Sequence, residues 1–116
     1  MKSYQLTIIV PIYNEEGNIE RLSSKLLAYF KSSSVLAKAL LVDDGSKDKS
    51  LERIKEVTEK HDNIEYISFE ENRGLSAAIK AGFDHVKTPL TGYIDADLQT
   101  DPEDFDLLLP YIYDFD

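Results

Sequence analysis

Near its amino terminus the chain reads Leu6-Thr7-Ile8-Ile9-Val10-Pro11-Ile12, an almost unbroken run of apolar and β-branched residues. A strand that is apolar on both faces is typical of a parallel sheet, because helices cover such a sheet on both sides. Pro11 has no N–H to donate to a ladder, so we expect the strand to end about there. The following stretch, Tyr13-Asn14-Glu15-Glu16-Gly17-Asn18, is typical of a turn.

The same strand-to-turn pattern recurs along the chain. Three more β-rich runs predict strands at 39–42, 64–69 and 90–94, the third strand of the four being the more exposed one. Between the strands, apolar residues at helical spacing predict three helices. Their expected buried faces are Ile19, Leu22, Leu26 and Phe30; Leu51, Ile54 and Val57 or Thr58; and Leu75, Ala78, Ile79, Gly82, Phe83 and Val86.

Helix-start residues place the beginnings of these helices. Asn18 and Asp48 are the expected N-caps of the first two helices, and Pro102 opens a last helix, from about Glu103 to Tyr113. The small residues of the third helix would let it pack close to a sheet. The βαβαβαβα order predicts a mostly parallel, Rossmann-like α/β sheet, for which we expect the strand order 3-2-1-4.

Composition sets limits on the class of protein. The 116 residues suffice for one domain with a real core. Thirteen basic and 22 acidic residues give a net charge of −9, which argues against a nucleic-acid partner and against attachment to an anionic membrane. The absence of cysteine excludes disulfides and a thiolate zinc site. Neither a signal peptide nor a bilayer-spanning segment is recognisable, so we expect a cytoplasmic chain.

The fourth expected strand runs into a pair of carboxylates, in the stretch Gly92-Tyr93-Ile94-Asp95-Ala96-Asp97-Leu98-Gln99. Side chains at i and i+2 of an extended backbone point the same way, so Asp95 and Asp97 can reach one hard cation. Gln99 continues that spacing with an amide oxygen. A divalent cation held there could neutralise a diphosphate. An isolated Asp-x-Asp is also common as an acidic turn before a helix.

Polar clusters follow three of the expected strands, and the ligand crevice of an open parallel sheet lies at the carboxyl ends of its strands. In the order 3-2-1-4, the first and fourth strands would flank that crevice. Tyr13 can stack on a base or ribose, and Asp43 or Glu15 can accept from base N–H groups or ribose hydroxyls. Arg73 can pair with a base carbonyl or a phosphate.

Two common nucleotide motifs are absent from the sequence: no G-x-G-x-x-G follows the first strand, and no P-loop occurs. A receiver domain of a signalling protein is also an acidic α/β unit with an Asp pair that binds Mg²⁺. It needs that pair after the first strand, however, and a Lys after a fifth strand, which we do not expect here. A non-catalytic module that keeps only the crevice stays open as an alternative.

Four stretches together make the chain resemble the family 2 glycosyltransferases of the GT-A fold. They are Ile9–Glu16, Val42–Asp48, Asn72–Gly74 with Ala78 and Gly82-Phe83, and Asp95–Gln99, which occur in the family's order and approximate spacing. The Asp-Ala-Asp-Leu-Gln sequence followed by Asp101-Pro102-Glu103 is similar to the polyprenyl-phosphate branch, which includes dolichol-phosphate mannosyltransferase.

The resemblance implies transfer of a sugar from a UDP- or GDP-sugar to an acceptor, with polyprenyl phosphate as the candidate acceptor and Mg²⁺ or Mn²⁺ on the diphosphate. It implies metal contacts from Asp95, Asp97 and Gln99. It also implies nucleotide contacts at the following residues: Pro11, Tyr13, Asn14, Glu15, Asp43, Arg73, Gly74, Asp95 and Ala96.

The resemblance covers residues 1–116 as the nucleotide-sugar-binding half of a family domain, without the acceptor half. We therefore expect the catalytic base to lie outside this chain, and this chain by itself to be inactive. Surface that the other half would cover, including Leu107-Leu108-Leu109, leads us to expect self-association. Membrane association of a longer protein stays open, as do the sugar, the base and the stereochemistry.

Overall fold

One sheet organises the residues that the computed structural model describes, which are 3–94 and 113–114. The elements are β1 (Leu6–Ile12), α1 (Ile19–Ser32), β2 (Ala37–Asp43), α2 (Ser50–Lys60), β3 (Ile64–Ser68), α3 (Leu75–His85), β4 (Leu90–Tyr93) and β5 (Tyr113–Asp114). The strand order is β3-β2-β1-β4-β5. The strands β1 to β4 run parallel, and β5 is antiparallel to β4. The predicted order 3-2-1-4 is confirmed.

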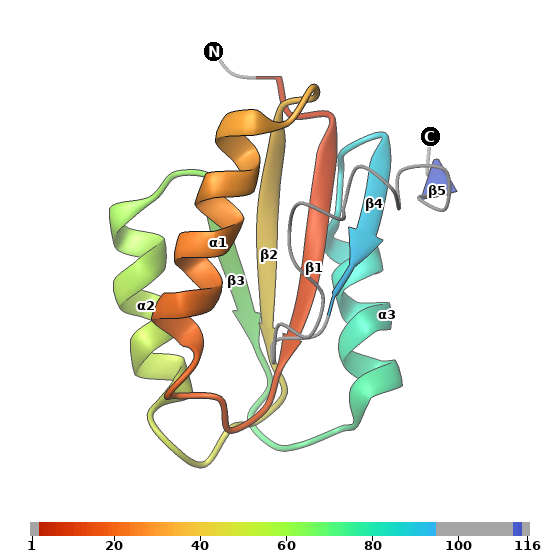
Figure 1. Cartoon of the computed structure of the whole chain (residues 1–116). Coiled ribbons are helices and arrows are strands. Elements are labelled where there is room, and N and C mark those ends of the chain that lie inside the picture. Colours follow the sequence, from red (N-terminus) through yellow and green to blue (C-terminus); the bar gives the residue numbers. More distant parts are fainter. Residues whose placement is uncertain (1–2, 95–112, 115–116) are drawn as a thin grey trace.

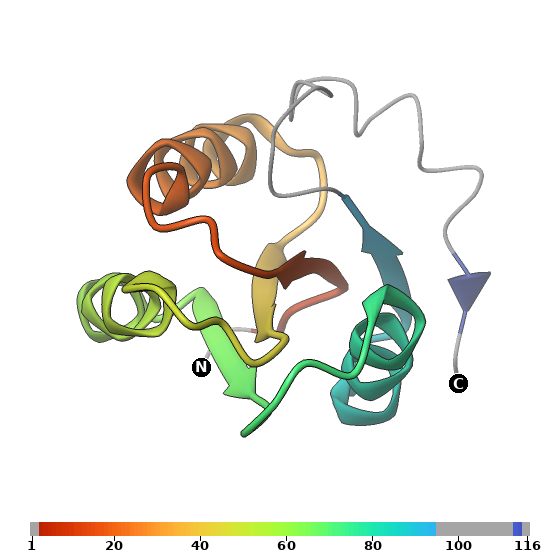
Figure 2. The same cartoon turned by 90° about the horizontal axis from the view of Figure 1, so that it is seen from below.

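Helices cover both faces of this sheet, as its apolar strands require. Helices α1 and α2 lie on one face and α3 lies on the other (Figures 1 and 2). The larger apolar cluster joins α1 and α2 to the sheet, with Ile19, Leu22 and Leu26 of α1 fully buried. The smaller cluster lies under α3 and includes Ile9, Leu40, Val42 and Ala78. Alternate residues of β1 and β2 therefore serve the two clusters.

Strand β1 lies in the middle of the sheet and extends one residue beyond Pro11. Ile9 accepts a hydrogen bond from Ile94 N at 3.0 Å, so its polar groups face β4. Residues two apart face the same neighbour, so the nitrogen of Pro11 also lies on the β4 side. The register of β1 with β4 ends at Ile9, and Pro11 therefore removes no ladder bond from the described sheet.

Helix α3 packs close to β1, as its small residues predict. A Cβ placed on Gly82 would lie 2.7 Å from Ile9 Cγ2 and 2.9 Å from Ile9 Cδ1. These distances are shorter than side chains tolerate, so only glycine permits this approach of helix and strand. Ala78, one turn earlier, is also fully buried.

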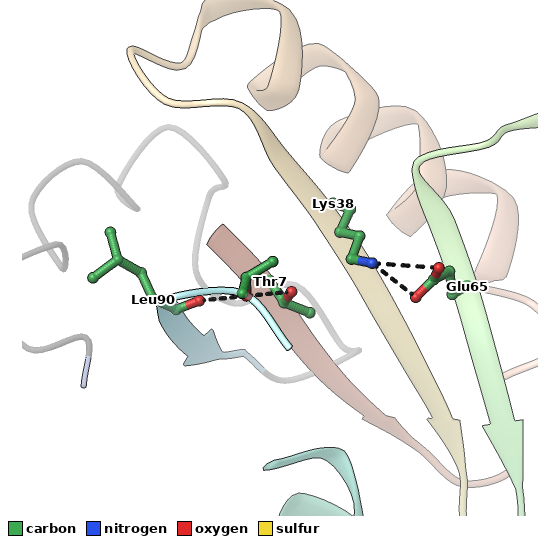
Figure 3. Close-up of polar contacts among 5 residues, drawn as sticks. Thr7, Lys38, Glu65 and Leu90 are labelled. Carbon is green, nitrogen blue, oxygen red and sulfur yellow. Dashed lines mark hydrogen bonds and ion pairs between the residues drawn. The ribbon is translucent and has the colours of Figure 1, made fainter. Parts of the chain in front are cut away.

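Polar contacts hold the sheet at the opposite end from the strands' carboxyl termini (Figure 3). Thr88 Oγ1 donates to Leu90 O at 2.8 Å, and the hydroxyls of Thr88 and Thr7 are 2.7 Å apart. This pair links the start of β4 to the start of β1. Lys38 of β2 forms an ion pair with Glu65 of β3 at 3.3 Å. These contacts help to hold the register of β1 with β4 and of β2 with β3. That register determines how the strand ends line up at the opposite edge of the sheet.

The carboxyl-terminal part of the chain differs from the prediction. We expected four strands and a last helix reaching Tyr113, but Tyr113 and Asp114 form β5 beside Thr91 and Leu90. The exposed edge of β4 offers unpaired backbone groups, and pairing with them outweighs the local helical pattern at Tyr113. The rest of the expected helix, 103–112, lies outside the described residues.

Of the two predicted N-caps, Asn18 lies at the predicted position and Asp48 does not. Asn18 occupies the N-cap position of α1, but its side chain makes no cap hydrogen bond and donates instead to Glu15 Oε2 at 2.6 Å. Asp48 stands one residue before the N-cap Lys49, and its Oδ1 accepts from Ser50 N at 2.8 Å. Leu75, expected on the buried face of α3, is 57% exposed because it lies in the first turn, beyond the edge of the sheet.

The topology excludes the receiver-domain alternative. Receiver domains have the doubly wound order 2-1-3-4-5. Here β2 lies between β1 and β3, and the fifth strand is antiparallel. Among the helices within residues 3–94, none combines the length and the apolar character that crossing a bilayer demands.

Candidate functional site

Three loops meet at the carboxyl edge of the sheet, at the lower end of Figure 1. They follow β1, β2 and β3, and the loop after β2 lies between the other two. Asp44 N donates to Ile12 O at 2.8 Å, and Phe69 N donates to Asp43 O at 2.9 Å. The start of the β2 loop is therefore bonded to β1 on one side and to the end of β3 on the other.

The β2 loop holds the β1 loop by side-chain contacts to successive backbone amides. Asn14 N donates to Ser46 Oγ at 2.9 Å, and Lys47 N donates back to Asn14 Oδ1 at 2.8 Å. Glu15 N donates to Ser50 Oγ at 2.7 Å. Asn14 has φ +54°, a left-handed conformation that asparagine tolerates better than most residues. These bonds set the path of the chain just after Tyr13.

Asp48 adds a charged contact to the same pair of loops. Its Oδ2 accepts from Glu16 N at 3.3 Å, and its Oδ1 accepts from Ser50 N. Partial burial acts to raise the pKa of Asp48, but the hydrogen bonds from Ser50 and from the amide of Glu16 outweigh it, so the pKa lies below its ordinary value. The ionised form of Asp48 is therefore the one that holds the loops together.

On the other side, Asp44 holds the loop that precedes α3. Its carboxylate is nearly buried, at 4% exposure. Oδ1 accepts from Arg73 N at 2.7 Å, and Oδ2 accepts from Gly74 N at 3.0 Å and from Asn72 Nδ2 at 3.1 Å. Hydrogen bonds from these three donors offset the desolvation cost of burying the carboxylate.

Gly45 lets these two loops approach each other. It has φ +68°, and a Cβ there would lie 2.3 Å from the backbone carbon of Glu71 and 2.4 Å from Asn72 N. No side chain fits at this position, because both contacts are to backbone atoms. The neighbouring Asp44 can reach the amides of the 72–74 loop because of this close approach.

A small open pocket of about 220 Å³ lies between the end of β1 and the start of α3. It is lined by Pro11, Ile12, Tyr13, Asp44, Asn72, Gly74 and Leu75. Tyr13 is 40% exposed there and Leu75 57%, so two large side chains are open to a ligand beside the buried carboxylate of Asp44. Such an arrangement can accept a flat group with an apolar face and a hydrogen-bonding edge.

The structure brings together some of the predicted nucleotide-contact residues in this pocket, namely Pro11, Tyr13 and Gly74. Asn14 and Glu15 lie next to it, and their backbone amides bond to the β2 loop. Asp43 is 1% exposed at the end of β2, where its Oδ1 accepts from Ser46 N at 3.3 Å. The Arg73 guanidinium carbon lies 4.6 Å from the centroid of the Phe69 ring, a cation–π contact.

The predicted metal contacts Asp95, Asp97 and Gln99, together with Ala96, lie outside the described residues. Ile94, immediately before them, is bonded to Ile9 of β1. Within residues 3–94, no cluster of three or more His, Asp or Glu side chains could hold a metal ion.

Sequence reasoning assigned no role to three residues that connect the loops of this edge. Asp44, Ser46 and Ser50 carry most of the side-chain contacts between the loops. Asp43 and Asp44 follow one another, so one of the pair had to face away from the other. The Gly45 that follows was a usable signal, since a glycine after a strand often marks a close backbone approach.

Comparison with known proteins identifies the family. Residues 7–116 match the family described as glycosyl transferase family 2. The chain belongs to this family. The match spans β1 to β5 and includes all three loops of the carboxyl edge.

Two curated relatives show how much of such proteins the chain covers. An undecaprenyl-phosphate 4-deoxy-4-formamido-L-arabinose transferase of Photorhabdus laumondii is 39% identical over 106 residues, which are 90% of this chain and 33% of the relative. A dolichyl-phosphate beta-glucosyltransferase of Trichomonas vaginalis is 36% identical over 111 residues, 91% of this chain and 34% of the relative. The family 2 chain thus spans about a third of the length of these relatives.

Solved structures agree with the family in their fold. A mannosyltransferase from Pyrobaculum calidifontis, in complex with GDP-Man and Mn²⁺, has a TM-score of 0.67 at 24% identity, over 83% of this chain and 28% of that one. Glucosyl-3-phosphoglycerate synthase from Mycobacterium tuberculosis, in complex with Mn²⁺, UDP and glucosyl-3-phosphoglycerate, has a TM-score of 0.72 at 18% identity. That match covers 93% of this chain and 39% of the synthase.

Proposed function

We propose that this family 2 chain forms the nucleotide-sugar-binding part of a glycosyltransferase, and that the acceptor-binding part and the catalytic base lie in further sequence. The observation that carries the proposal is the pocket between β1 and α3, at the carboxyl edge where open parallel sheets bind ligands. The chain matches about a third of the length of the two curated relatives, which supports placing the acceptor-binding part and the catalytic base in further sequence.

The pocket suits the nucleoside of the donor. Its volume of about 220 Å³ is below the range of about 300–1,000 Å³ that is usual for whole drug-sized ligands, so it fits a part of a nucleotide. The exposed ring of Tyr13 offers a stacking surface, and Pro11, Gly74 and Leu75 add apolar and backbone walls. Asp43, at the buried end of β2, is the proposed acceptor for base N–H groups or ribose hydroxyls.

The diphosphate of the donor requires a cation in this protein. The chain carries a net charge of −9, so a diphosphate beside its carboxylates meets repulsion unless a divalent ion lies between them. Two carboxylates and an amide oxygen, from Asp95, Asp97 and Gln99, are the hard oxygen donors that Mg²⁺ and Mn²⁺ accept. Such an ion, when bound, neutralises charge that develops on the leaving diphosphate.

Names of the relatives and neighbours support the substrate classes. The two curated relatives are named for transfer to undecaprenyl phosphate and to dolichyl phosphate, so we propose a polyprenyl phosphate as the acceptor of the full-length protein. The two solved structures hold GDP-Man or UDP together with Mn²⁺, which supports a UDP- or GDP-sugar donor. A non-catalytic nucleotide-binding module would share the same pocket.

Calorimetric titration of the chain with UDP and with GDP, each in Mn²⁺ and in EDTA, tests the proposal. We expect one of the two nucleotides to bind with Mn²⁺ and to bind at least about tenfold more weakly in EDTA, a difference of about 1.4 kcal/mol. Asp97→Ala should abolish most of the metal dependence. Sugar transfer by these 116 residues should be undetectable.

The Asp43→Asn variant distinguishes the contribution of nucleoside contacts to the affinity from the contribution of the metal ion. It should weaken binding while the ratio of affinities in Mn²⁺ and EDTA stays the same, because the proposed partner of Asp43 is the base or ribose. A nucleotide that bound equally well in EDTA, or an Asp97→Ala variant with unchanged metal dependence, would show the metal assignment to be wrong. A chain that bound neither nucleotide would overturn the proposed function.

A further inference from the structure

Asp44 connects both walls of the pocket. Its backbone N–H donates to Ile12 O at 2.8 Å, at the β1 wall. Its carboxylate accepts from the backbone amides of Arg73 and Gly74 at 2.7 and 3.0 Å, at the α3 wall. Asp44 therefore links the end of β1 to the loop before α3 by direct hydrogen bonds.

The hydrogen-bond pattern requires a carboxylate. Each of the two oxygens receives a backbone N–H, and Oδ2 also receives the side-chain amide of Asn72 at 3.1 Å. Asparagine has a single acceptor oxygen, and its amide nitrogen would face an N–H donor. Replacing Asp44 by asparagine thus leaves at least one backbone donor of the loop unpaired beside the pocket.

The same contacts restrict what the α3 wall can bind. The first amides of a helix and of the residues before it often bind phosphate. At this helix start, the amides of Arg73 and Gly74 already donate to Asp44, whose negative charge also repels an anion. A phosphate would have to displace a buried carboxylate to use them.

We infer that Asp44 is a positioning residue, which fixes the 72–74 loop as a wall for the uncharged nucleoside and keeps the diphosphate away from the start of α3. This inference rests on the proposed nucleotide binding. Asp44 acts through the backbone of Arg73 and Gly74, and its loss should weaken nucleoside binding without changing the metal dependence.

Asp44→Asn tests the inference, with Asp62→Asn as the matched control, since Asp62 is exposed and the change in charge is the same. The affinity for UDP and GDP in Mn²⁺ is measured by calorimetry at a temperature where circular dichroism shows both variants folded. Amide spectra by NMR report the hydrogen bonds of Arg73 and Gly74. We expect Asp44→Asn to weaken binding at least about tenfold and to shift both amides upfield, and Asp62→Asn to change neither.

Asn72→Ala provides a second variant if Asp44→Asn does not fold. Asn72 is exposed, and its replacement removes one donor to Asp44 while leaving both backbone bonds. We expect faster hydrogen exchange at the Gly74 amide and an affinity that falls about threefold.

Two outcomes separate this inference from the proposed function. If the unaltered chain binds UDP or GDP, and a folded Asp44→Asn variant binds within twofold of it, the positioning role is overturned while the proposed function stands. In the Asn72→Ala variant, unchanged Gly74 exchange and unchanged affinity would overturn it equally. If the unaltered chain binds neither nucleotide, the proposed function fails first.

Discussion

At the scale of single residues, the carboxyl edge depends on backbone conformations that most side chains avoid. Asn14, Gly45 and Gly74 all have positive φ, at 54°, 68° and 99°. Each stands in one of the three loops that meet at the pocket. A Cβ on Gly74 would meet open space, so only its positive φ favours glycine there. At Gly45 both the positive φ and the lack of space for a Cβ require glycine.

Gly45→Ala should therefore be strongly destabilising. The left-handed conformation costs a non-glycine residue about 1–3 kcal/mol, and the clash with the backbone of Glu71 and Asn72 adds an overpacking cost of similar size. We expect the free energy of unfolding, measured with urea, to fall by about 2–5 kcal/mol. Gly17→Ala is the control: Gly17 is exposed with nothing within 4 Å, and its change should stay within about 0.5 kcal/mol. Equal effects of the two changes would contradict this reading of Gly45.

At the scale of elements, the site depends on where α3 lies relative to β1. The helix begins at Leu75, directly after the pocket residue Gly74, and its buried face carries Ala78 and Gly82. Contact between Gly82 and Ile9 determines how near the helix comes to the sheet. A larger residue at position 82 would move the carboxyl-terminal half of α3 away from the strand.

Gly82→Ala tests this close packing. In an exposed helix the change would stabilise by about 1 kcal/mol, but here the added Cβ meets Ile9 at 2.7 Å, and overpacking costs about 1–3 kcal/mol. We expect net destabilisation of about 0.5–2 kcal/mol in urea unfolding. In an Ile9→Ala background the same change should become neutral or stabilising, since all three contacted atoms are gone. Additive effects in this double-mutant cycle would argue against the contact.

At the scale of the whole molecule, the sheet keeps an incomplete edge. Strand β5 pairs only with Leu90 and Thr91, so within the described chain Gly92 and Tyr93 have no neighbour on that side. Tyr93 is 55% exposed there. Strand β3 forms the other edge, where Glu65 brings a charge that discourages pairing.

Self-association remains our prediction, and the incomplete edge of β4 is the surface that we now propose for it. Sedimentation velocity over a concentration series should show reversible association, and Tyr93→Lys should weaken it because a charge on an edge strand opposes pairing. Glu65→Lys, on the β3 edge, serves as the comparison and should have a smaller effect. A monomer at every concentration would refute the prediction, and a larger effect of Glu65→Lys would place the contact at the other edge.

The sequence by itself determined the local structure, and it predicted the edge of the sheet at which we propose that the nucleotide binds. Apolar runs and helical spacing are short-range patterns, so β1 and the buried face of α1 could be predicted from them. The alternation of strands and helices led to the order 3-2-1-4, and the small residues of α3 led to its close packing on the sheet. The motifs after the strands located the pocket at the carboxyl edge. Family membership followed from the same stretches.

Only the tertiary structure decided which residues do what at that edge. Local sequence does not tell Asp43 from Asp44, because the role of Asp44 depends on partners about 30 positions away, namely Arg73 and Gly74. The exposure of Leu75 depends on how far α3 extends past the sheet, and Tyr113 became a strand because β4 offered an edge to pair with. Each of these outcomes is set by contacts between segments that are far apart in the chain and meet only when the sheet has formed.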